Sequence, residues 1–271
     1  MTDSPIRVLA PNPSVFTGRG TNTYLTGDRS LVCIDPGPDD DRHLDAILAA
    51  AAASGGDITA IALTHSHPDH RPLATRLSSM TGAAVYCFDP SAGDEGAHAL
   101  SDGDVLRQGD LELIAVHTPG HTHDHLCFFD AEARTLYTGD HILNGTTSVV
   151  HPGEGDMSDY IQSLRRVQGL HPLTILPGHG ERVDDAAALI EEYIAHRLDR
   201  EAQVLTAAQG RPAFTPMELV PTLYAGYPVA VYPLAAWTVQ AHLDKLVRDG
   251  RIDRVDVGSD AEPPRYIAAR S

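Results

Sequence analysis

The stretch Thr64-His65-Ser66-His67-Pro68-Asp69-His70 carries three imidazoles and one carboxylate within a single short loop. It directly follows the apolar run Ile58 to Leu63, which has the length and composition of a buried strand. Active sites of layered α/β folds gather where strands end. These residues therefore indicate a functional site at the end of this strand.

The spacing of the loop's side chains suits metal ions. His65 and His67 are two residues apart, so in an extended chain both point the same way, toward one ion. Asp69 and His70 follow at a turn fixed by Pro68, which opens a neighbouring direction for a second ion. Imidazole and carboxylate ligands suit Zn²⁺, and also Mn²⁺ or Fe. The alternative, a solvated loop of unpartnered histidines, fits four ligand-type residues after an apolar strand less well.

Composition limits the classes of protein to consider. The 271 residues suffice for one large domain and a small one, and no apolar run approaches the length of a membrane span. The net charge of −17 opposes non-specific binding to phosphate backbones, which requires Lys and Arg. The first residues lack the pattern of a secretory signal, and Cys33, Cys87 and Cys127 are typical of buried free thiols. A cytoplasmic protein without a membrane segment is expected.

Strand-like and helix-like patterns alternate along the first 210 residues. The expected strands span residues 6–9, 31–34, 58–63, 84–88, 111–116, 126–129, 135–137 and 173–176. The expected helices begin after Asp39, near Pro72, near Ser158 and near Asp184. Such alternation predicts an α/β fold in which helices cover the sheets.

The pattern changes after Gly210-Arg211-Pro212, which divides the chain into residues 1–210 and residues 211–271. In the second part, Thr215 and Glu218 are spaced as a capping box that opens a short helix.

A second helix is expected over Ala235 to Arg248, with Trp237 on its buried side. A short strand beginning near Ile252 is expected to pair with residues 266–267, so the tail predicts a winged-helix-like module.

Three further ligand-type residues stand at the ends of predicted strands. His121, Asp140 and His179 each follow a glycine, which lets the backbone bend sharply and brings the side chain toward a shared centre. Together with the four side chains of the loop, they form a candidate metal centre.

These motifs resemble those of the metallo-β-lactamase superfamily. The matching segments, in the same order along roughly residues 6–210, are His65-x-His67-x-Asp69-His70, Thr118-Pro119-Gly120-His121-Thr122, Gly139-Asp140 and Pro177-Gly178-His179-Gly180. More narrowly, the segments Gly20 to Leu25, His121 to His125 and Gly145-Thr146-Thr147 and the winged-helix-like tail are similar to the branch that contains the β-lactamase-like protein 2 endoribonucleases and fungal acyl-carrier thioesterases.

The resemblance implies an αββα sandwich with a dinuclear site. It implies that one ion is held by His65, His67 and His121, the other by Asp69, His70 and His179, and that Asp140 bridges both. This donor set resembles that of the zinc members, so two Zn²⁺ are expected, with Mn²⁺ or Fe as alternatives. Lactam-hydrolysing relatives commonly place a cysteine at the second ion, whereas no cysteine of this chain lies in a ligand motif. Lactam hydrolysis is therefore not the expected native reaction.

The resemblance also implies a hydrolytic mechanism. Two cations about 3.5–4 Å apart hold a bridging hydroxide at neutral pH. Asp69 is expected to orient that hydroxide and take its proton. Asp35 is expected to hydrogen-bond a ligand imidazole, the alternative being a simple turn before Pro36.

Other polar residues are candidates for the substrate mouth. The resemblance places Asn22, Thr146 and Thr147 there. Arg71 stands where relatives usually have a small residue, which predicts an effect on substrate choice.

A structural or solvated role is favoured over proton donation for His125, His141 and His151. A solvated helix face is favoured over a basic rim for Arg165, Arg166, Arg197 and Arg200.

The leading hypothesis is a dizinc hydrolase of esters, thioesters or phosphodiesters. The acidic composition favours a small-molecule or acyl substrate, and the branch resemblance favours single-stranded RNA. A nucleic-acid-binding regulator with a structural metal is less favoured, because residues 235–248 offer only Lys245 and Arg248 to a DNA groove. The tail is expected to cover the active site or to form a homodimer contact.

Overall fold

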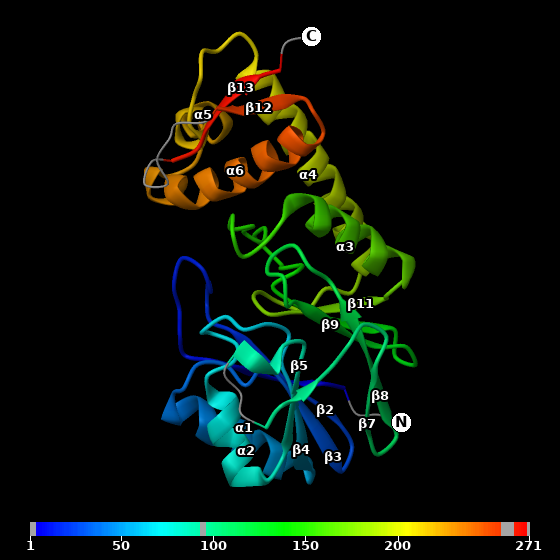
Figure 1. Cartoon of the computed structure of the whole chain (residues 1–271). Coiled ribbons are helices and arrows are strands. Elements are labelled where there is room, and N and C mark those ends of the chain that lie inside the picture. Colours follow the sequence, from blue (N-terminus) through cyan, green and yellow to red (C-terminus); the bar gives the residue numbers. More distant parts are fainter. Residues whose placement is uncertain (1–3, 93–95, 256–262, 270–271) are drawn as a thin grey trace.

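Two β-sheets pack face to face, and helices cover the outer face of each (Figure 1). The computed structural model describes residues 4–92, 96–255 and 263–269. The predicted α/β class and the αββα sandwich are confirmed. No helix within the described ranges is both long and apolar enough to cross a bilayer.

The first sheet runs in the order β1-β2-β3-β4-β5-β6. Its strands are β1 (Ile6–Leu9), β2 (Asn22–Gly27), β3 (Ser30–Ile34), β4 (Asp57–Ala62), β5 (Ala84–Cys87) and β6 (His98–Ala99). Helices α1 (Asp41–Ser54) and α2 (Leu73–Thr81) connect the parallel strands β3, β4 and β5 and cover this sheet. The expected strands omit residues 22–25, which belong to the fully buried strand β2.

The second sheet runs in the order β11-β10-β9-β8-β7. Its strands are β7 (Val105–Gln108), β8 (Leu111–His117), β9 (Leu126–Asp130), β10 (Thr135–Gly139) and β11 (Thr174–Pro177). Strand β10 pairs antiparallel with β9. Helices α3 (Met157–Gly169) and α4 (Ala186–Ala208) pack on the outer face of this sheet.

Strand β9 shows why these strands are apolar throughout. Leu126 and Phe128 face the core between the two sheets, whereas Cys127 and Phe129 face the core under α3 and α4. Successive side chains of a strand point to opposite faces, so a strand buried on both faces needs an unbroken apolar run. Cys33, Cys87 and Cys127 are buried thiols, as predicted.

Helix starts differ from the sequence prediction at two places. Asp40 caps α1, with its side chain accepting from the backbone N–H of Arg42 and His43, so the choice of Asp39 was wrong. Asp156 caps α3 in place of Ser158. In both cases an aspartate one or two residues away has the extended backbone that lets its oxygen meet the free N–H groups of the first turn.

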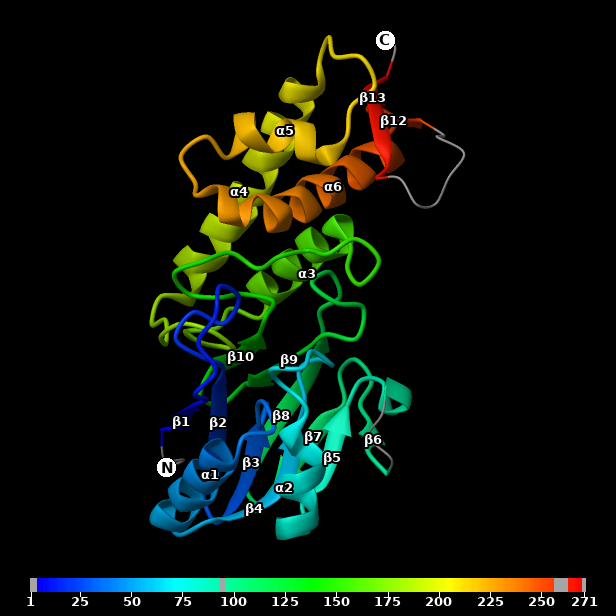
Figure 2. The same ribbon diagram turned by 90° about the vertical axis from the view of Figure 1, so that its left-hand side faces the viewer.

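The tail forms the predicted winged-helix-like module at the far end of the molecule (Figure 1). Its elements are α5 (Pro216–Leu223), the 3₁₀ turn η2 (Val229–Val231), α6 (Tyr232–Arg248), β12 (Ile252–Val255) and β13 (Arg265–Ala268). The capping box at Thr215 and Glu218 is present, and β12 pairs with β13. Figure 2 shows α6 lying across the sandwich above α3, with α4 joining the two parts. Because α4 ends at Ala208, a boundary near residue 210 fits the structure but stays a prediction.

Candidate metal centre

The loops that follow β4, β8, β10 and β11 meet at one edge of the sandwich. They bring together the seven predicted ligand side chains in two adjoining groups, each with its donor atoms within 4.8 Å of one another. We refer to these seven residues as the ligand cluster. One group is His65, His67, His121 and Asp140, and the other is Asp69, His70 and His179.

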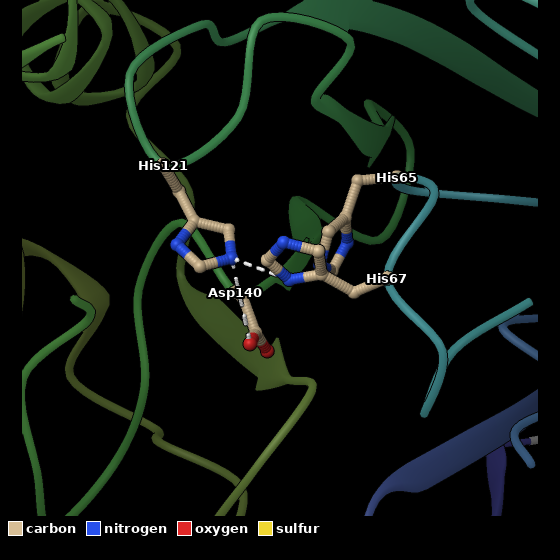
Figure 3. A group of neighbouring side chains, drawn as sticks. All are labelled: His65, His67, His121 and Asp140. Carbon is tan, nitrogen blue, oxygen red and sulfur yellow. Dashed lines mark hydrogen bonds and ion pairs between the residues drawn. The ribbon is translucent and has the colours of Figure 1, made fainter. Parts of the chain in front are cut away.

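Figure 3 shows the first group. His65 and His67 enter from the loop after β4, and His121 enters from the opposite side, with Asp140 beside them. The Nε2 atom of His121 lies 3.1 Å from Nδ1 of His67 and 3.8 Å from Oδ2 of Asp140. Three imidazole nitrogens and one carboxylate oxygen thus converge on one point.

The second group shares Asp140 with the first. Oδ2 of Asp69 lies 3.2 Å from Nε2 of His179 and 3.4 Å from Nε2 of His70. Oδ1 of Asp140 lies 3.3 Å from both of those nitrogens. Since its two oxygens face different groups, Asp140 has the geometry of a bridging ligand.

The unpaired atoms of the cluster fit divalent cations. Nε2 of His65, Nε2 of His70 and Oδ1 of Asp140 are buried, and none has a hydrogen-bond partner in the described part of the chain. A buried polar atom without a partner costs free energy, so several pointing at one spot require a ligand there. Imidazole nitrogens and carboxylate oxygens in two groups of three or four match zinc, and also manganese or iron.

Asp35 fixes the tautomers of two ligand histidines. Its Oδ2 accepts from Nδ1 of His70 at 2.8 Å and from the Thr64 hydroxyl at 2.7 Å, and its Oδ1 accepts from the Thr64 backbone N–H at 2.8 Å. Because the Thr64 hydroxyl donates its proton to Asp35, it accepts from Nδ1 of His65 at 2.9 Å. Both rings therefore present a bare Nε2 to the centre. The predicted contact between Asp35 and a ligand imidazole is present.

Backbone carbonyls orient two further rings. Nδ1 of His121 donates to the carbonyl of Val149 at 2.7 Å and lies 3.2 Å from the Ser148 hydroxyl, while Nδ1 of His179 donates to the carbonyl of Gly20 at 3.2 Å. Their Nε2 atoms then face the cluster. His67 is reversed and faces the cluster through Nδ1.

Two glycines let the strand ends approach closely. A Cβ on Gly139 would lie 2.4 Å from Oγ1 of Thr64, and this residue also has a positive φ of 44°. A Cβ on Gly178 would lie 2.7 Å from Oδ1 of Asp140. Larger side chains would push the Asp140 and His179 loops out of the cluster.

The charges within the cluster are strongly coupled. Burial opposes ionisation of Asp69, but His70 and His179 outweigh it and hold the pKa of the carboxyl below its ordinary value. Burial likewise opposes protonation of His179, but Asp140 outweighs it and raises the pKa of that imidazole to about 9. The carboxylates are therefore ionised at neutral pH and attract cations.

A cavity of about 890 Å³ opens over the ligand cluster. Five members of the cluster line its base, namely His67, Asp69, His121, Asp140 and His179. Val15 and Phe16, at the exposed tip of the segment between β1 and β2, line another side. Residues of α4, the segment that follows α5, and α6 complete the lining, so the tail module contributes to the cavity. This volume is typical of sites for small molecules.

The three residues predicted to line the substrate mouth lie in different places. Thr146 and Thr147 are exposed and line the cavity, as expected. Asn22 does not, and that prediction was wrong. It is 1% exposed, and its amide donates to the carbonyls of Pro177 and Gly180, both at 2.8 Å. Asn22 therefore holds the loop that carries His179.

Several other residues lie where the sequence reasoning did not place them. Trp237 is not core but 36% exposed, lines the cavity and packs its ring 4.5 Å from that of His151. Arg197 and Arg200 are buried in the cavity wall and not solvated.

Four further residues considered in the sequence analysis can be placed in the structure. His125 and His141 are fully buried, in line with the structural role favoured for them, and His151 lines the cavity. Arg71 contributes instead to a small separate pocket beside Leu63 and Phe88.

Comparisons with known proteins agree with the site. Residues 16–179 match the model of the metallo-beta-lactamase superfamily, and residues 215–259 match that of the beta-lactamase associated winged helix domain. A beta-lactamase-like protein 2 homolog from Drosophila melanogaster is 35% identical over 283 residues, 97% of this chain and 94% of that protein. An atrochrysone carboxyl ACP thioesterase from Paecilomyces divaricatus is 34% identical over 231 residues, 81% of this chain and 71% of that protein.

A crystal structure of a metallo-beta-lactamase family protein from Thermus thermophilus has the same fold. It superposes with a TM-score of 0.80 at 23% identity, covering 97% of this chain and 98% of that one.

Proposed function

The chain belongs to the metallo-β-lactamase superfamily, and on that premise we propose that it is a dizinc hydrolase of small-molecule esters or thioesters. The observation that carries the proposal is the sharing of Asp140 between two groups of donors, with one oxygen toward each. These donors would hold two cations, which would supply a nucleophile at neutral pH and polarise the oxygen of the scissile group. Manganese or iron would serve the same geometry.

Asp69 is the proposed catalytic residue of the chain. Its Oδ2 accepts from the Thr21 hydroxyl at 3.0 Å, which fixes the carboxylate at the base of the cavity. The lowered pKa keeps the carboxyl ionised at neutral pH, so it can orient an attacking water and take up its proton.

The cavity and the charge support a small-molecule substrate. A volume of about 890 Å³ suits a ligand of moderate size, whereas a chain with a net charge of −17 opposes a polyanion. A relative that is named as an ACP thioesterase also supports ester or thioester chemistry. The test must therefore distinguish ester or thioester hydrolysis from cleavage of phosphodiesters or single-stranded RNA.

The structure gives no support to the regulator alternative. Lys245 of α6 is paired with Glu201 at 3.0 Å and with Asp249 at 2.7 Å, and Arg248 is paired with Asp156 at 2.5 Å. Both cations of α6 are thus already paired with carboxylates. Dimer formation and a cytoplasmic location stay predictions.

A substrate screen tests the proposed function. Zinc-loaded protein is expected to hydrolyse short acyl thioesters and aryl esters but not a single-stranded oligouridylate. His65→Ala should lower kcat/KM by about 10³-fold or more, since it removes a ligand of the first ion. His98→Ala, at an exposed histidine outside the cavity, is the matched control and should leave kcat/KM unchanged. Turnover of the oligouridylate alone, lost in His65→Ala, would contradict the proposed substrate class.

A further inference from the structure

Helix α4 places two buried arginines in the wall of the cavity. Arg197 is 1% exposed and Arg200 is 8% exposed, and both line the same cavity as the ligand cluster. Arginine is rarely buried to this extent unless it is paired. Two such residues, one helical turn apart, therefore need an explanation.

The protein satisfies these guanidinium groups only in part. Arg197 donates from Nη2 to the carbonyl of Ser148 at 2.6 Å and lies 4.8 Å from the centre of the Tyr160 ring. Arg200 donates from Nη1 to the carbonyl of Leu223 at 2.7 Å and lies 4.2 Å from the centre of the Tyr224 ring. In the described part of the chain, neither buried Nε has a partner. A guanidinium has five N–H donors, so each arginine keeps donating capacity.

No carboxylate balances the two charges. Within residues 4–92, 96–255 and 263–269, neither Arg197 nor Arg200 forms an ion pair, although the chain has 37 acidic residues. Glu201, a half-buried acid next to Arg200 in α4, pairs with Lys245 instead. A buried charge without a counter-ion is costly, so this arrangement fits a wall that receives its counter-ion from a ligand.

Neighbouring histidines respond to the unbalanced charge. Burial, followed by the charges of Arg197 and Arg200, lowers the pKa of His196, although Asp199 and Glu192 act in the opposite direction, and holds that of His242 well below its ordinary value. Protonation of these rings beside the arginines is thus disfavoured, as expected of a region with excess positive charge.

The rest of this wall is apolar and aromatic. Tyr224, Tyr227, Val231, Leu234 and Trp237 line the cavity beside the arginines. A ligand that fills the space between the ligand cluster and the arginines therefore meets a largely apolar surface. The cavity accordingly fits an amphipathic molecule with an apolar body and one anionic end.

We propose that Arg197 and Arg200 form an anion-binding subsite that selects esters or thioesters carrying a carboxylate or phosphate remote from the scissile bond. The anion lies either on the acyl group or on the leaving group. This inference rests on the proposed hydrolase function and adds the class of its substrate. Planar guanidinium groups bind carboxylates and phosphates through paired N–H donors, which suits them to this role.

A matched set of three thioesters tests the subsite. Pentanoyl-pantetheine is neutral, the glutaryl thioester of pantetheine adds a carboxylate on the acyl side, and pentanoyl-phosphopantetheine adds a phosphate on the leaving-group side. The wild-type protein should prefer one of the two anionic thioesters over the neutral one by about tenfold or more in kcat/KM. Which one it prefers identifies the position of the anion.

Variants at α4 show whether the arginine causes the preference. Arg200→Gln should lower the ratio of kcat/KM for the preferred anionic thioester to that for the neutral one by about tenfold. Arg200→Lys keeps the charge and should keep most of the preference, which separates a charge effect from a packing effect. The matched control is Arg165→Gln, at an exposed arginine of α3 that does not line the cavity and should leave the ratio unchanged. No preference in the wild type, or the same preference in Arg200→Gln, overturns the proposal.

Binding distinguishes failure of the subsite from failure of the proposed function. If none of the thioesters is hydrolysed, the proposed function fails, and calorimetric titration with glutarate and with inorganic phosphate still tests the subsite. At least one of these anions should bind the wild type about tenfold more tightly than Arg200→Gln. Equal affinities overturn the subsite. Arg200-dependent cleavage of an oligouridylate without thioester turnover overturns the small-molecule assignment.

Discussion

The two sides of the cavity are built in different ways. At its base, the ligand cluster comes from loops at strand ends, and four of its five imidazoles are held by a carbonyl, a hydroxyl or a carboxylate. On the opposite side, the helical wall is made of side chains from α4, from the segment that follows α5, and from α6, which combine aromatic rings with the partly satisfied Arg197 and Arg200. On the proposed function, the ligand cluster carries out the chemistry and the helical wall determines which substrates bind. Substitutions in the ligand cluster should lower turnover of every substrate, and substitutions in the helical wall should alter selectivity between substrates.

The largest effect is expected at Asp69. Asp69→Asn keeps the shape of the side chain but removes both the proton acceptor and a carboxylate ligand of the second donor group, so kcat/KM should fall by about 10²–10⁴-fold for all thioesters alike. Steady-state kinetics with the neutral and the anionic thioesters measures this, with the exposed Asp110→Asn as the control. A loss of kcat/KM confined to the anionic thioesters would show that the ligand cluster, and not only the helical wall, determines selectivity.

A smaller effect is expected at Asp35, which contacts His70 and Thr64 but lies behind the cluster. Asp35→Asn should weaken metal affinity by about 10–100-fold, because it disturbs the tautomer of His70 and the Thr64 hydroxyl that orients His65. Competition with a chromophoric chelator measures the affinity. Unchanged metal affinity would show that these hydrogen bonds do not support the ligands.

Acid should lower the stability of the fold through His43, a buried residue of α1. This imidazole is 1% exposed and lies 2.8 Å from the Thr23 hydroxyl, and burial lowers its pKa to about 4. The unfolded chain binds a proton near pH 6.5 and the folded chain does not, so stability is complete above that pH and is lost as the pH falls toward about 4.

Between pH 7 and pH 5 the free energy of unfolding should fall by about 1–2 kcal/mol through this group. Urea unfolding of the wild type and of His43→Gln at both values checks this. The variant should show a smaller pH dependence, and an identical one would exclude the contribution of His43.

On the helical wall, Trp237→Ala should raise KM several-fold and change kcat little. The indole lines the cavity and packs on His151 without touching the ligand cluster, so it contributes binding area but no chemistry. Kinetics with pentanoyl-pantetheine measures this. A fall in kcat as large as that of Asp69→Asn would contradict the assignment of the wall to binding.

The smallest effect is expected at the capping box of α5. The Thr215 backbone N–H and hydroxyl donate to the Glu218 carboxylate at 2.6 Å and 2.9 Å. Thr215→Ala removes the second bond and Glu218→Ala removes both, so each should lower the stability of the tail module by about 0.5–2 kcal/mol. Thermal unfolding followed by circular dichroism measures this. Metal content should be unaffected, and a change in it would show that the tail stabilises the base directly.

The ligand cluster at the base of the cavity was predictable from sequence because its residues lie in short motifs. His65, His67, Asp69 and His70 lie in one loop, and His121, Asp140 and His179 each follow a glycine at a strand end. Residue type and spacing therefore sufficed to predict which side chains meet. Asn22 failed the same reasoning because its position in β2, which turns its amide toward the His179 loop, depends on strand pairing.

The helical wall was not predicted, although part of its signal is in the sequence. The buried face of α4 repeats every three or four residues through Ile190, Tyr193, Arg197, Arg200 and Val204. The two arginines thus occupy positions in the buried stripe of α4. Because arginine is charged, the sequence analysis placed them on a solvated helix face. Trp237 carries no such signal, because its exposure to the cavity depends on how α6 packs across the sandwich.

The number of divalent cations bound per chain tests the central claim most directly, since two groups of donors that share Asp140 should hold two ions. Native mass spectrometry of the zinc-loaded wild-type protein should show two ions per chain. A single ion at saturation, with all seven ligand side chains intact, would contradict the dinuclear centre.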